Sequence, residues 1–291
     1  MKFSIPVAFL NPLELPAIAR AAEEAGFHAL AISDHVVHPA DIESKYPYTE
    51  DGGRHWNAAT PWPDPWVTIG ALAAVTTTLR FFTNVYILPA RNPFLVAKAV
   101  GTAAVLSSNR VALGIGVGWM KEEFDLLGQP FEGRGRRTDE AIEILRLLWS
   151  GRTIEYHGEC FSIPPTSMSP VPSAPIPIYG GGLSKPAFRR AARLLDGWIA
   201  VIHSTEELRG MVAELHRLRA DAGRSELPFE VIGTATDAFD VDGYRRLEGV
   251  GITGVFALPW RLYRVEKESL AVRCDALRRF GDEVIRRMDR D

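Results

Sequence analysis

Hydrophobic and polar positions follow two alternating patterns along this chain. Short apolar runs, typical of strands that are buried on both faces, are each followed by a segment in which apolar residues recur every three or four positions, as on one face of a helix. The first such helix places five apolar residues on one face: Leu15, Ile18, Ala19, Ala22 and Ala25. Gly26 then supplies a natural end for that helix. The apolar runs predict strands at residues 2–9, 29–33, 81–88, 111–117, 176–179, 198–202, 229–234 and 253–258.

Eight strands that each precede a helix predict a parallel sheet closed into a (β/α)8 TIM barrel. The length of 291 residues suits one such barrel, so we expect a single domain over residues 1–291. Two stretches interrupt the alternation, a polar and aromatic one at residues 36–63 and a proline- and serine-rich one at residues 151–177. We interpret them as insertion loops at the C-terminal face of the barrel and not as linkers between domains.

Composition excludes several classes of function. A net charge of -3 gives no basic field that would attract nucleic acid or an anionic membrane. No apolar run approaches the roughly 20 residues that a membrane span needs, and the N-terminus lacks the apolar stretch of a signal peptide. The two cysteines, Cys160 and Cys274, suggest neither a disulfide framework nor a zinc site. We therefore expect a cytoplasmic protein that acts on a small molecule.

The end of the second predicted strand carries Asp34 and His35. In a barrel of this type the site lies where strands end and helices begin. A histidine titrates near neutral pH, and an adjacent carboxylate can orient it for proton transfer, so His35 is a candidate catalytic base. The alternative is a loop histidine beside an aspartate that caps a helix or forms a surface pair. His38 adds a His-x-x-His spacing, but no third ligand is evident, and we expect no metal.

Glycines end the fourth predicted strand. Gly116, Gly118 and Trp119 close the segment at residues 114–119. Glycine at such a position lets a ligand approach the backbone closely, although small residues can also simply fill a tight turn. Trp119 can stack on a ring system or belong to the core. The glycine spacing is not that of a dinucleotide-binding fingerprint.

A second glycine run follows the fifth predicted strand. Gly180, Gly181 and Gly182 precede a helix that begins at Ser184. The exposed amides and the positive dipole end of a helix N-terminus form a ready anion site, and phosphate is the expected anion in a barrel. A purely structural turn is the alternative.

The insertion at residues 36–63 is rich in aromatic residues, among them His55, Trp56 and Trp62. Aromatic side chains above a barrel mouth can form a lid that contacts the substrate, which makes Trp56 and Trp62 candidate substrate-binding residues. They can equally belong to a dimer interface, where tryptophan and tyrosine are enriched.

Together these motifs resemble those of the luciferase-like monooxygenase superfamily, and within it the deazaflavin-dependent oxidoreductases that use coenzyme F420. The similarity runs from residue 2 to about residue 259. Its landmarks are AAEEAGF at residues 21–27, SDH at 33–35, LSSNRV at 106–111, GIGVGWMKEEF at 114–124, IYGGG at 178–182 and DGW at 196–198. Each motif is modest alone, but their order and spacing together make a specific match.

The resemblance implies a flavin-type cofactor, coenzyme F420, at the C-terminal face of the barrel, and a homodimer. It implies a bulge in the third strand with a cis peptide bond between Asn84 and Val85, which supports the ring system of the cofactor. Asp34 and His35 match positions close to the reactive ring, and His35 matches a proposed catalytic base. The glycines at residues 180–182 match the turn that holds the phosphate.

The segment that contains Gly116, Gly118 and Trp119 resembles the deazaflavin branch, so we expect these residues beside the cofactor. Trp119 stands where the sugar-phosphate dehydrogenases of this group have a glutamate that is proposed to donate a proton. We therefore do not expect oxidation of a sugar phosphate.

Three hypotheses for the function follow. The first is a coenzyme F420-dependent oxidoreductase that transfers a hydride between the deazaflavin and a small organic substrate. The second is an FMN-dependent monooxygenase that uses reduced flavin and oxygen, because the same glycine turn could hold either phosphate. The third is a flavin-binding barrel without catalysis. The substrate and the direction of hydride transfer do not follow from the sequence, since loops vary freely on this fold.

Overall fold

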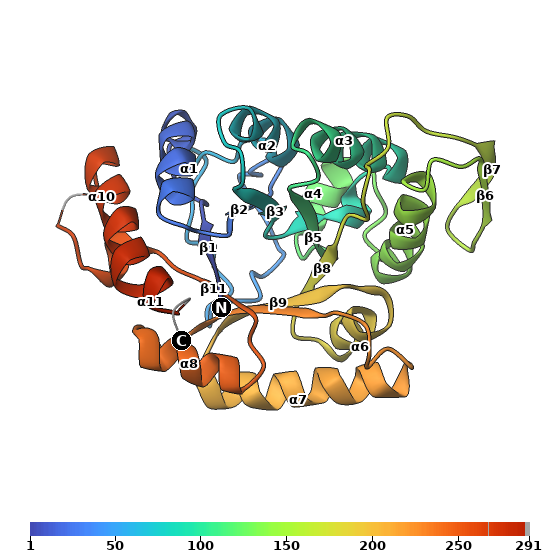
Figure 1. Ribbon diagram of the computed structural model, residues 1–291. Coiled ribbons are helices and arrows are strands. Elements are labelled where there is room, and N and C mark those ends of the chain that lie inside the picture. The colour runs from blue at the N-terminus through green and yellow to red at the C-terminus, as the bar shows by residue number, and fades with distance from the viewer. Residues whose placement is uncertain (267, 289–291) are drawn as a thin grey trace.

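The computed structural model describes residues 1–266 and 268–288, which form a closed barrel of parallel strands surrounded by helices (Figure 1). Its strands are β1 (Lys2–Pro6), β2 (Ala29–Ile32), β3 (Arg80–Thr83), β4 (Tyr86–Ile87), β5 (Val111–Gly116), β8 (Ile178–Gly181), β9 (Gly197–His203), β10 (Glu230–Ala235) and β11 (Gly254–Phe256). They pair in the order β3-β2-β1-β11-β10-β9-β8-β5-β4, and a further pairing of β3 with β5 closes the barrel. Because β3 and β4 both pair with β5 as two halves of one barrel strand, the predicted (β/α)8 barrel is confirmed.

The third barrel strand is interrupted at its centre. A cis peptide bond joins Asn84 to Val85 between β3 and β4, and the 3-10 turn η2 (Leu88–Ala90) follows β4 directly. The expected non-proline cis bond is confirmed. The strand expected at residues 81–88 is divided by the bulge that was also expected, and its last residue, Leu88, begins η2.

Helices cover the outside of the barrel, with α1, α2 and α3 along one side and α6, α7 and α8 along the opposite side in Figure 1. Their bounds are α1 (Leu15–Glu24), α2 (Pro65–Ala73), α3 (Pro93–Leu106), α4 (Lys121–Leu126), α5 (Arg134–Leu148), α6 (Lys185–Leu194), α7 (Thr205–Asp221), α8 (Val241–Gly249), α9 (Pro259–Leu262), α10 (Leu270–Phe280) and α11 (Arg286–Met288). A short 3-10 turn, η1 (Pro12–Glu14), precedes α1, and a π-helical turn, η3 (Gly281–Ile285), joins α10 to α11. Within the described residues, no helix has the length and apolar character needed to cross a membrane.

Side-chain caps fix where the helices begin at the C-terminal face. Among the described residues, six α-helices start at a residue whose side chain accepts a hydrogen bond from a backbone N–H in the first turn: Asp64 for α2, Asn92 for α3, Ser184 for α6, Ser204 for α7, Asp240 for α8 and Ser269 for α10. Such caps satisfy amides that have no partner within the helix. They set the positions of the loops between strands and helices, which form the mouth of the barrel.

The inside of the barrel is filled by side chains. Phe82 on β3 has its ring centroid 6.0 Å from those of both Tyr179 and Phe256, and small alanines on neighbouring strands make room for these rings. A filled interior is the usual state of an eight-stranded barrel. A ligand therefore has no room inside the barrel, and the strand ends are the expected place for a site.

The two insertions occupy different places. Residues 36–63 follow β2 and lie at the C-terminal face, as expected. Residues 151–177 connect the end of α5 to the start of β8, so they leave from the opposite end of the barrel, and they contain an antiparallel hairpin of β6 (Ile154–His157) and β7 (Ser162–Thr166) beside α5 (Figure 1). Their interpretation as a loop at the C-terminal face was wrong. The two prolines in β7 disfavour a strand in the sequence, and they are tolerated because this hairpin has only edge strands.

Glu23, in the last turn of α1, fixes the connection into β3 at the end of the barrel away from the mouth. Its Oε1 accepts hydrogen bonds from the amides of Thr77, Thr78 and Leu79 at 2.8, 2.5 and 2.8 Å, and from the Thr78 hydroxyl at 3.0 Å. Burial would raise the pKa of Glu23, but these hydrogen bonds outweigh it and lower the pKa from 4.5 to about 2.

A carboxylate whose pKa is lowered by folding stabilises the protein above its unfolded pKa, and this stabilisation is lost as the pH falls through the folded pKa. We expect the free energy of unfolding to fall between pH 4.5 and about pH 2, and Glu23→Gln to flatten that fall. Urea unfolding followed by circular dichroism at a series of pH values measures it. Glu24→Gln, on the exposed neighbour, is the control, and an equal acid dependence in the two variants would contradict the role of Glu23.

Candidate functional site

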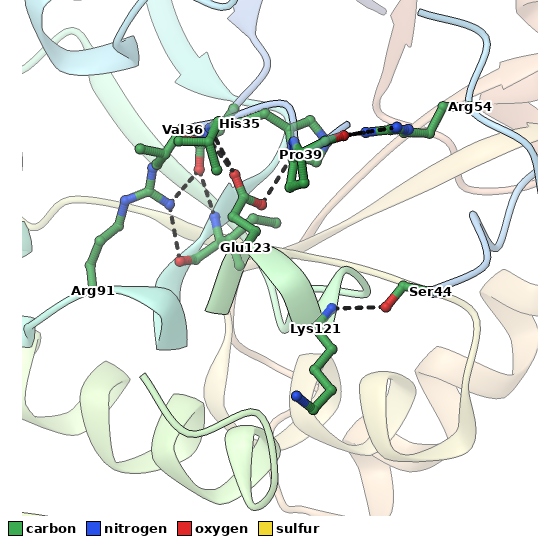
Figure 2. Close-up of polar contacts among 11 residues, drawn as sticks. His35, Val36, Pro39, Ser44, Arg54, Arg91, Lys121 and Glu123 are labelled. Carbon is green, nitrogen blue, oxygen red and sulfur yellow. Dashed lines mark hydrogen bonds and ion pairs between the residues drawn. The ribbon is translucent and has the colours of Figure 1, made fainter. Parts of the chain in front are cut away.

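The candidate site lies at the C-terminal ends of β2, β4, β5 and β8. Figure 2 shows its polar contacts, which join the loop after β2 to α4, the short helix after β5, and to Arg91 after η2. These contacts bring together residues that are far apart in the sequence.

His35 forms a pair with Glu123, a residue of α4. The His35 Nδ1 and the Glu123 Oε2 are 3.1 Å apart, and the Glu123 Oε1 accepts the Val36 amide at 2.7 Å and the Val37 amide at 3.4 Å (Figure 2). The Glu123 side chain is only 4% exposed. Burial would raise the pKa of Glu123, but the hydrogen bonds from His35 and the two amides lower it below its usual value.

An ionised Glu123 determines which nitrogen of His35 carries the proton. A carboxylate only accepts hydrogen bonds, so Nδ1 must be the donor. In the neutral ring the lone pair then lies on Nε2, which is the atom that can accept a proton from a substrate. The pairing thus gives His35 the orientation and the tautomer of a general base.

Asp34 was expected to be the carboxylate that orients His35, and this was wrong. Its two oxygens instead accept hydrogen bonds from Nη1 and Nη2 of Arg91, both at 2.7 Å. Oδ2 also accepts a hydrogen bond from the Ile87 amide at 3.0 Å. The Asp34 side chain is 1% exposed, and Arg91 lies over the Tyr86 ring. Neighbouring residues at the end of an extended strand point in opposite directions, so Asp34 and His35 take different partners.

The segment that precedes His35 holds the cis peptide bond on both sides. The Asn84 amide donates to the Ile32 carbonyl at 2.7 Å, and the Ser33 hydroxyl donates to the Asn84 carbonyl at 3.0 Å. Asp34 then binds the amide of Ile87 just beyond the bulge. The Ser-Asp-His motif therefore joins the bulge to the histidine.

Glycines on two strands make room for Val85. A Cβ at Gly116 on β5 would lie 2.7 Å from Val85 Cγ2, and one at Gly181 on β8 would lie 3.1 Å from Val85 Cγ1. Gly118, at the turn after β5, has φ +80°, a conformation that side chains rarely adopt. The structure thus brings Gly116 and Gly181, two predicted cofactor residues, against Val85 at the bulge, where Asn84 also lies.

The glycine turn after β8 is anchored by its own neighbours. A Cβ at Gly180 would lie 2.4 Å from Leu195 Cδ1, which gives this glycine a packing role. Gly182 has φ +108°, and its carbonyl accepts the Trp198 indole N–H at 3.0 Å. Ser184 caps α6 as expected. The phosphate that this turn would hold stays a prediction.

Aromatic side chains close over His35. The ring centroids of Trp56, Trp62 and Trp119 lie 5.3, 4.9 and 6.1 Å from that of His35. With their neighbours they form what we call the aromatic cluster: Phe9, Tyr46, His55, Trp56, Trp62 and Trp119. The residues predicted to contact substrate therefore lie beside the predicted base.

A second glutamate of α4 fixes the start of the insertion. Glu122 Oε1 accepts the amides of Glu43 and Ser44 at 2.7 and 3.1 Å, and the Ser44 hydroxyl accepts the Lys121 amide at 2.9 Å. Burial opposes the shift, but hydrogen bonds lower the pKa of Glu122 from 4.5 to about 2. Farther along, the Arg54 guanidinium donates to the Pro39 carbonyl (Figure 2).

Sequence reasoning missed Glu123, Glu122 and Arg91. The two glutamates begin a short helix after the glycine segment, and their position at a strand-to-helix connection was the available signal. Arg91 carried no local signal. His38 was weighed as a metal ligand, and in the part of the chain that the structure describes no group of three or more potential ligands surrounds a common point.

The packing of Val85 against Gly116 gives a test. Gly116→Ala adds a methyl group that collides with Val85, and we expect the free energy of unfolding to fall by about 1–3 kcal/mol, as for other overpacked sites. Gly70→Ala in α2, where a Cβ meets nothing within 4 Å, is the control and should raise it by about 0.5–1 kcal/mol. Urea unfolding measures both. Equal stability of the two variants would show that Gly116 does not make room for Val85.

Comparisons with known proteins give the family. Residues 10–240 match the family model described as luciferase-like monooxygenase. An uncharacterised protein of Mycobacterium tuberculosis is 42% identical over 288 residues, which cover 98% of this chain and 99% of that protein. An F420-dependent glucose-6-phosphate dehydrogenase of Nakamurella multipartita is 29% identical over 253 residues, which cover 85% of this chain and 70% of that protein.

Two solved structures share the fold. Coenzyme F420-dependent tetrahydromethanopterin reductase from Methanopyrus kandleri has a TM-score of 0.75 at 16% identity, with 99% of each chain covered. The oxygenating constituent of 3,6-diketocamphane monooxygenase from Pseudomonas putida, in complex with FMN, has a TM-score of 0.62 at 18% identity, with 85% of this chain and 71% of that chain covered. These two likenesses concern the fold alone. Because the family model covers most of its length, the chain belongs to the luciferase-like monooxygenase family of oxidoreductase enzymes.

Proposed function

We propose that this protein is a coenzyme F420-dependent oxidoreductase that transfers a hydride between the deazaflavin and a small organic substrate. The observation that carries the proposal is the pair of His35 and Glu123 at the barrel mouth, joined through residues 32–34 to the Asn84–Val85 bulge. Relatives named for their dependence on F420 support the choice of cofactor.

The residues at the mouth suit a planar ring and a phosphate. Val85 is half-buried at the bulge, where it presents an apolar surface backed by Gly116 and Gly181. Gly182 and the capped start of α6 offer backbone amides to an anion. When bound, the deazaflavin supplies the carbon that gives or takes the hydride.

His35 handles the proton in this proposal. In the oxidative direction its Nε2 accepts the hydroxyl proton of an alcohol, and the negative charge of Glu123 stabilises the imidazolium that forms. In the reductive direction the protonated ring donates the Nε2 proton to a carbonyl oxygen. The aromatic rings above His35 exclude water from this exchange.

The alternative is an FMN-dependent monooxygenase that uses reduced flavin and oxygen. The structural likeness to the FMN complex of the Pseudomonas putida enzyme favours it. The same bulge and glycine turn suit the ring and the phosphate of FMN.

We also propose that two copies of the chain associate into a homodimer. Helices α2 and α3 pack beside each other and expose apolar side chains. Val67, Leu95 and Leu106 are 74%, 71% and 69% exposed. A surface of this kind favours burial against a second copy.

A titration with the two cofactors separates the two functions. We expect coenzyme F420 to bind with a dissociation constant of about 1 μM or tighter, which corresponds to about 8 kcal/mol of binding free energy, and FMN to bind more weakly. Fluorescence of each cofactor, followed side by side with the same purified protein, measures both. Tight FMN binding with weak F420 binding would move the assignment to the monooxygenase.

Removal of the base should slow turnover more than it weakens cofactor binding. We expect His35→Ala to lower kcat by about 10²–10⁴-fold, the usual contribution of general acid–base catalysis, with cofactor affinity largely unchanged. His157→Ala, on the exposed hairpin, is the control. Wild-type turnover in His35→Ala would remove His35 from the mechanism.

Glu123→Gln tests the tautomer of His35. The new amide can donate to Nδ1, which would move the ring proton to Nε2 and leave no base there. We expect a fall in alcohol oxidation that is smaller in Glu123→Asp, together with a changed pH profile of kcat. A variant with lower stability but an unaltered pH profile would give Glu123 a structural role only.

A further inference from the structure

The aromatic cluster defines the chemical character of the surroundings of His35. Trp56 and Trp62 come from the insertion after β2, and Trp119 comes from the turn after β5. Trp56 and Trp62 are 5.6 Å apart, and Tyr46 lies 5.1 and 5.2 Å from Trp56 and Trp119. Most of these rings meet edge to face. A ligand that enters between them exchanges one apolar ring surface for another.

Three arginines and two glutamates near the barrel mouth make hydrogen bonds within the protein. Arg91 binds Asp34, Arg54 binds the Pro39 carbonyl, and Arg134 binds the Gly118 carbonyl at 3.1 Å and lies over Phe131. The carboxylates of Glu122 and Glu123 accept backbone amides. The buried carboxylate of Glu123 is in contact with His35, so it disfavours an anionic substrate beside that ring, whereas a neutral substrate meets no such repulsion.

Trp119 is the member of the cluster that comes from the turn after β5. The left-handed φ of Gly118 turns the chain just before it, and the Trp119 ring stands 84° from the plane of the His35 ring. The cluster also holds an unused donor, because the Trp62 indole N–H is buried without a hydrogen-bond partner among the described residues. Such a group destabilises a site unless a ligand satisfies it, and a neutral oxygen is a suitable acceptor.

We propose that the substrate is an uncharged cyclic ketone or the corresponding alcohol, held by the aromatic cluster, and that Trp119 sets this preference. The ring of the substrate packs between the indoles, and its oxygen lies near His35 and Trp62. The chemical step of this proposal rests on the proposed function, whereas the preference for a neutral ring does not.

The step balances without a further reactant. In the oxidative direction the carbinol C–H bond breaks and its hydride passes to oxidised coenzyme F420, which is reduced by two electrons. The O–H proton passes to Nε2 of His35, and the carbon–oxygen double bond forms. The reductive direction is the reverse.

A pair of hydride donors tests the preference. Cyclohexanol is the neutral cyclic probe, and glucose 6-phosphate is the anionic one, and reduction of F420 is followed by its loss of absorbance. We expect kcat/KM for cyclohexanol to exceed that for glucose 6-phosphate by roughly 100-fold or more, because bringing a phosphate charge against aromatic rings and the carboxylate of Glu123 costs free energy. Equal values, or a preference for glucose 6-phosphate, would overturn the proposal.

Matched variants test the residue. Trp119→Phe keeps an aromatic ring and should keep the preference, whereas Trp119→Glu should raise KM for cyclohexanol by roughly 10-fold or more without an equal fall in kcat. If circular dichroism shows that Trp119→Glu does not fold, Trp119→Gln is measured in its place. An unchanged KM in the polar variant would overturn the role of Trp119.

Ligand-observed NMR of the same probes separates this inference from the proposed function. If F420 does not bind, the proposed function fails. Binding of the two probes to the protein alone still decides whether the site prefers the neutral ring. Cyclohexanol signals that respond to the wild type and to Trp119→Phe, and not to Trp119→Glu, would support the neutral-ring site. Binding of glucose 6-phosphate in preference to cyclohexanol would overturn it.

Discussion

The buried carboxylate of Glu123 is the constraint on which the barrel mouth depends. Its charge is compensated by the His35 ring and by the amides of Val36 and Val37, which all come from the loop after β2. A buried carboxylate that lost these partners would destabilise the fold or take up a proton. The same interaction therefore orders the loop backbone, fixes α4 against the mouth and sets the tautomer of the histidine.

Asp34 and His35 divide two tasks because they point in opposite directions at the end of β2. Asp34 holds Ile87 and Arg91 just beyond the bulge, while His35 turns toward α4. The bulge is thus fixed from one side by hydrogen bonds. From the other side it is given room by glycines on β5 and β8, where any side chain would displace Val85. The position of the histidine and that of the bulge depend on the same four-residue segment.

The sequence predicted the barrel because its strands are apolar runs and its helices have apolar faces, and both patterns are local. It also predicted which strand ends carry chemistry, since parallel strands in a barrel end on the same face. It could not predict the partners. His35 and Glu123 are separated by 88 positions, and Asp34 and Arg91 by 57, so their pairing follows from the three-dimensional course of the loops. Asp34 was predicted to be the partner of His35 because it is adjacent in the sequence. This failed because proximity in sequence carries no information on side-chain direction.

Different forces hold the two halves of the insertion. Residues 36–44 are held by hydrogen bonds to the ionised Glu122 and Glu123, and hydrogen bonds to charged groups contribute about 1.5–3 kcal/mol each. Trp56 and Trp62 are held chiefly by ring contacts, which contribute about 0.5–1.5 kcal/mol per pair beyond their buried area. A ligand that enters between the rings replaces their apolar contacts but offers no substitute for the hydrogen bonds to Glu122 and Glu123, so we expect the rings to separate first. His35 would then stay paired with Glu123, and the proposed base would keep its orientation while a ligand binds and leaves.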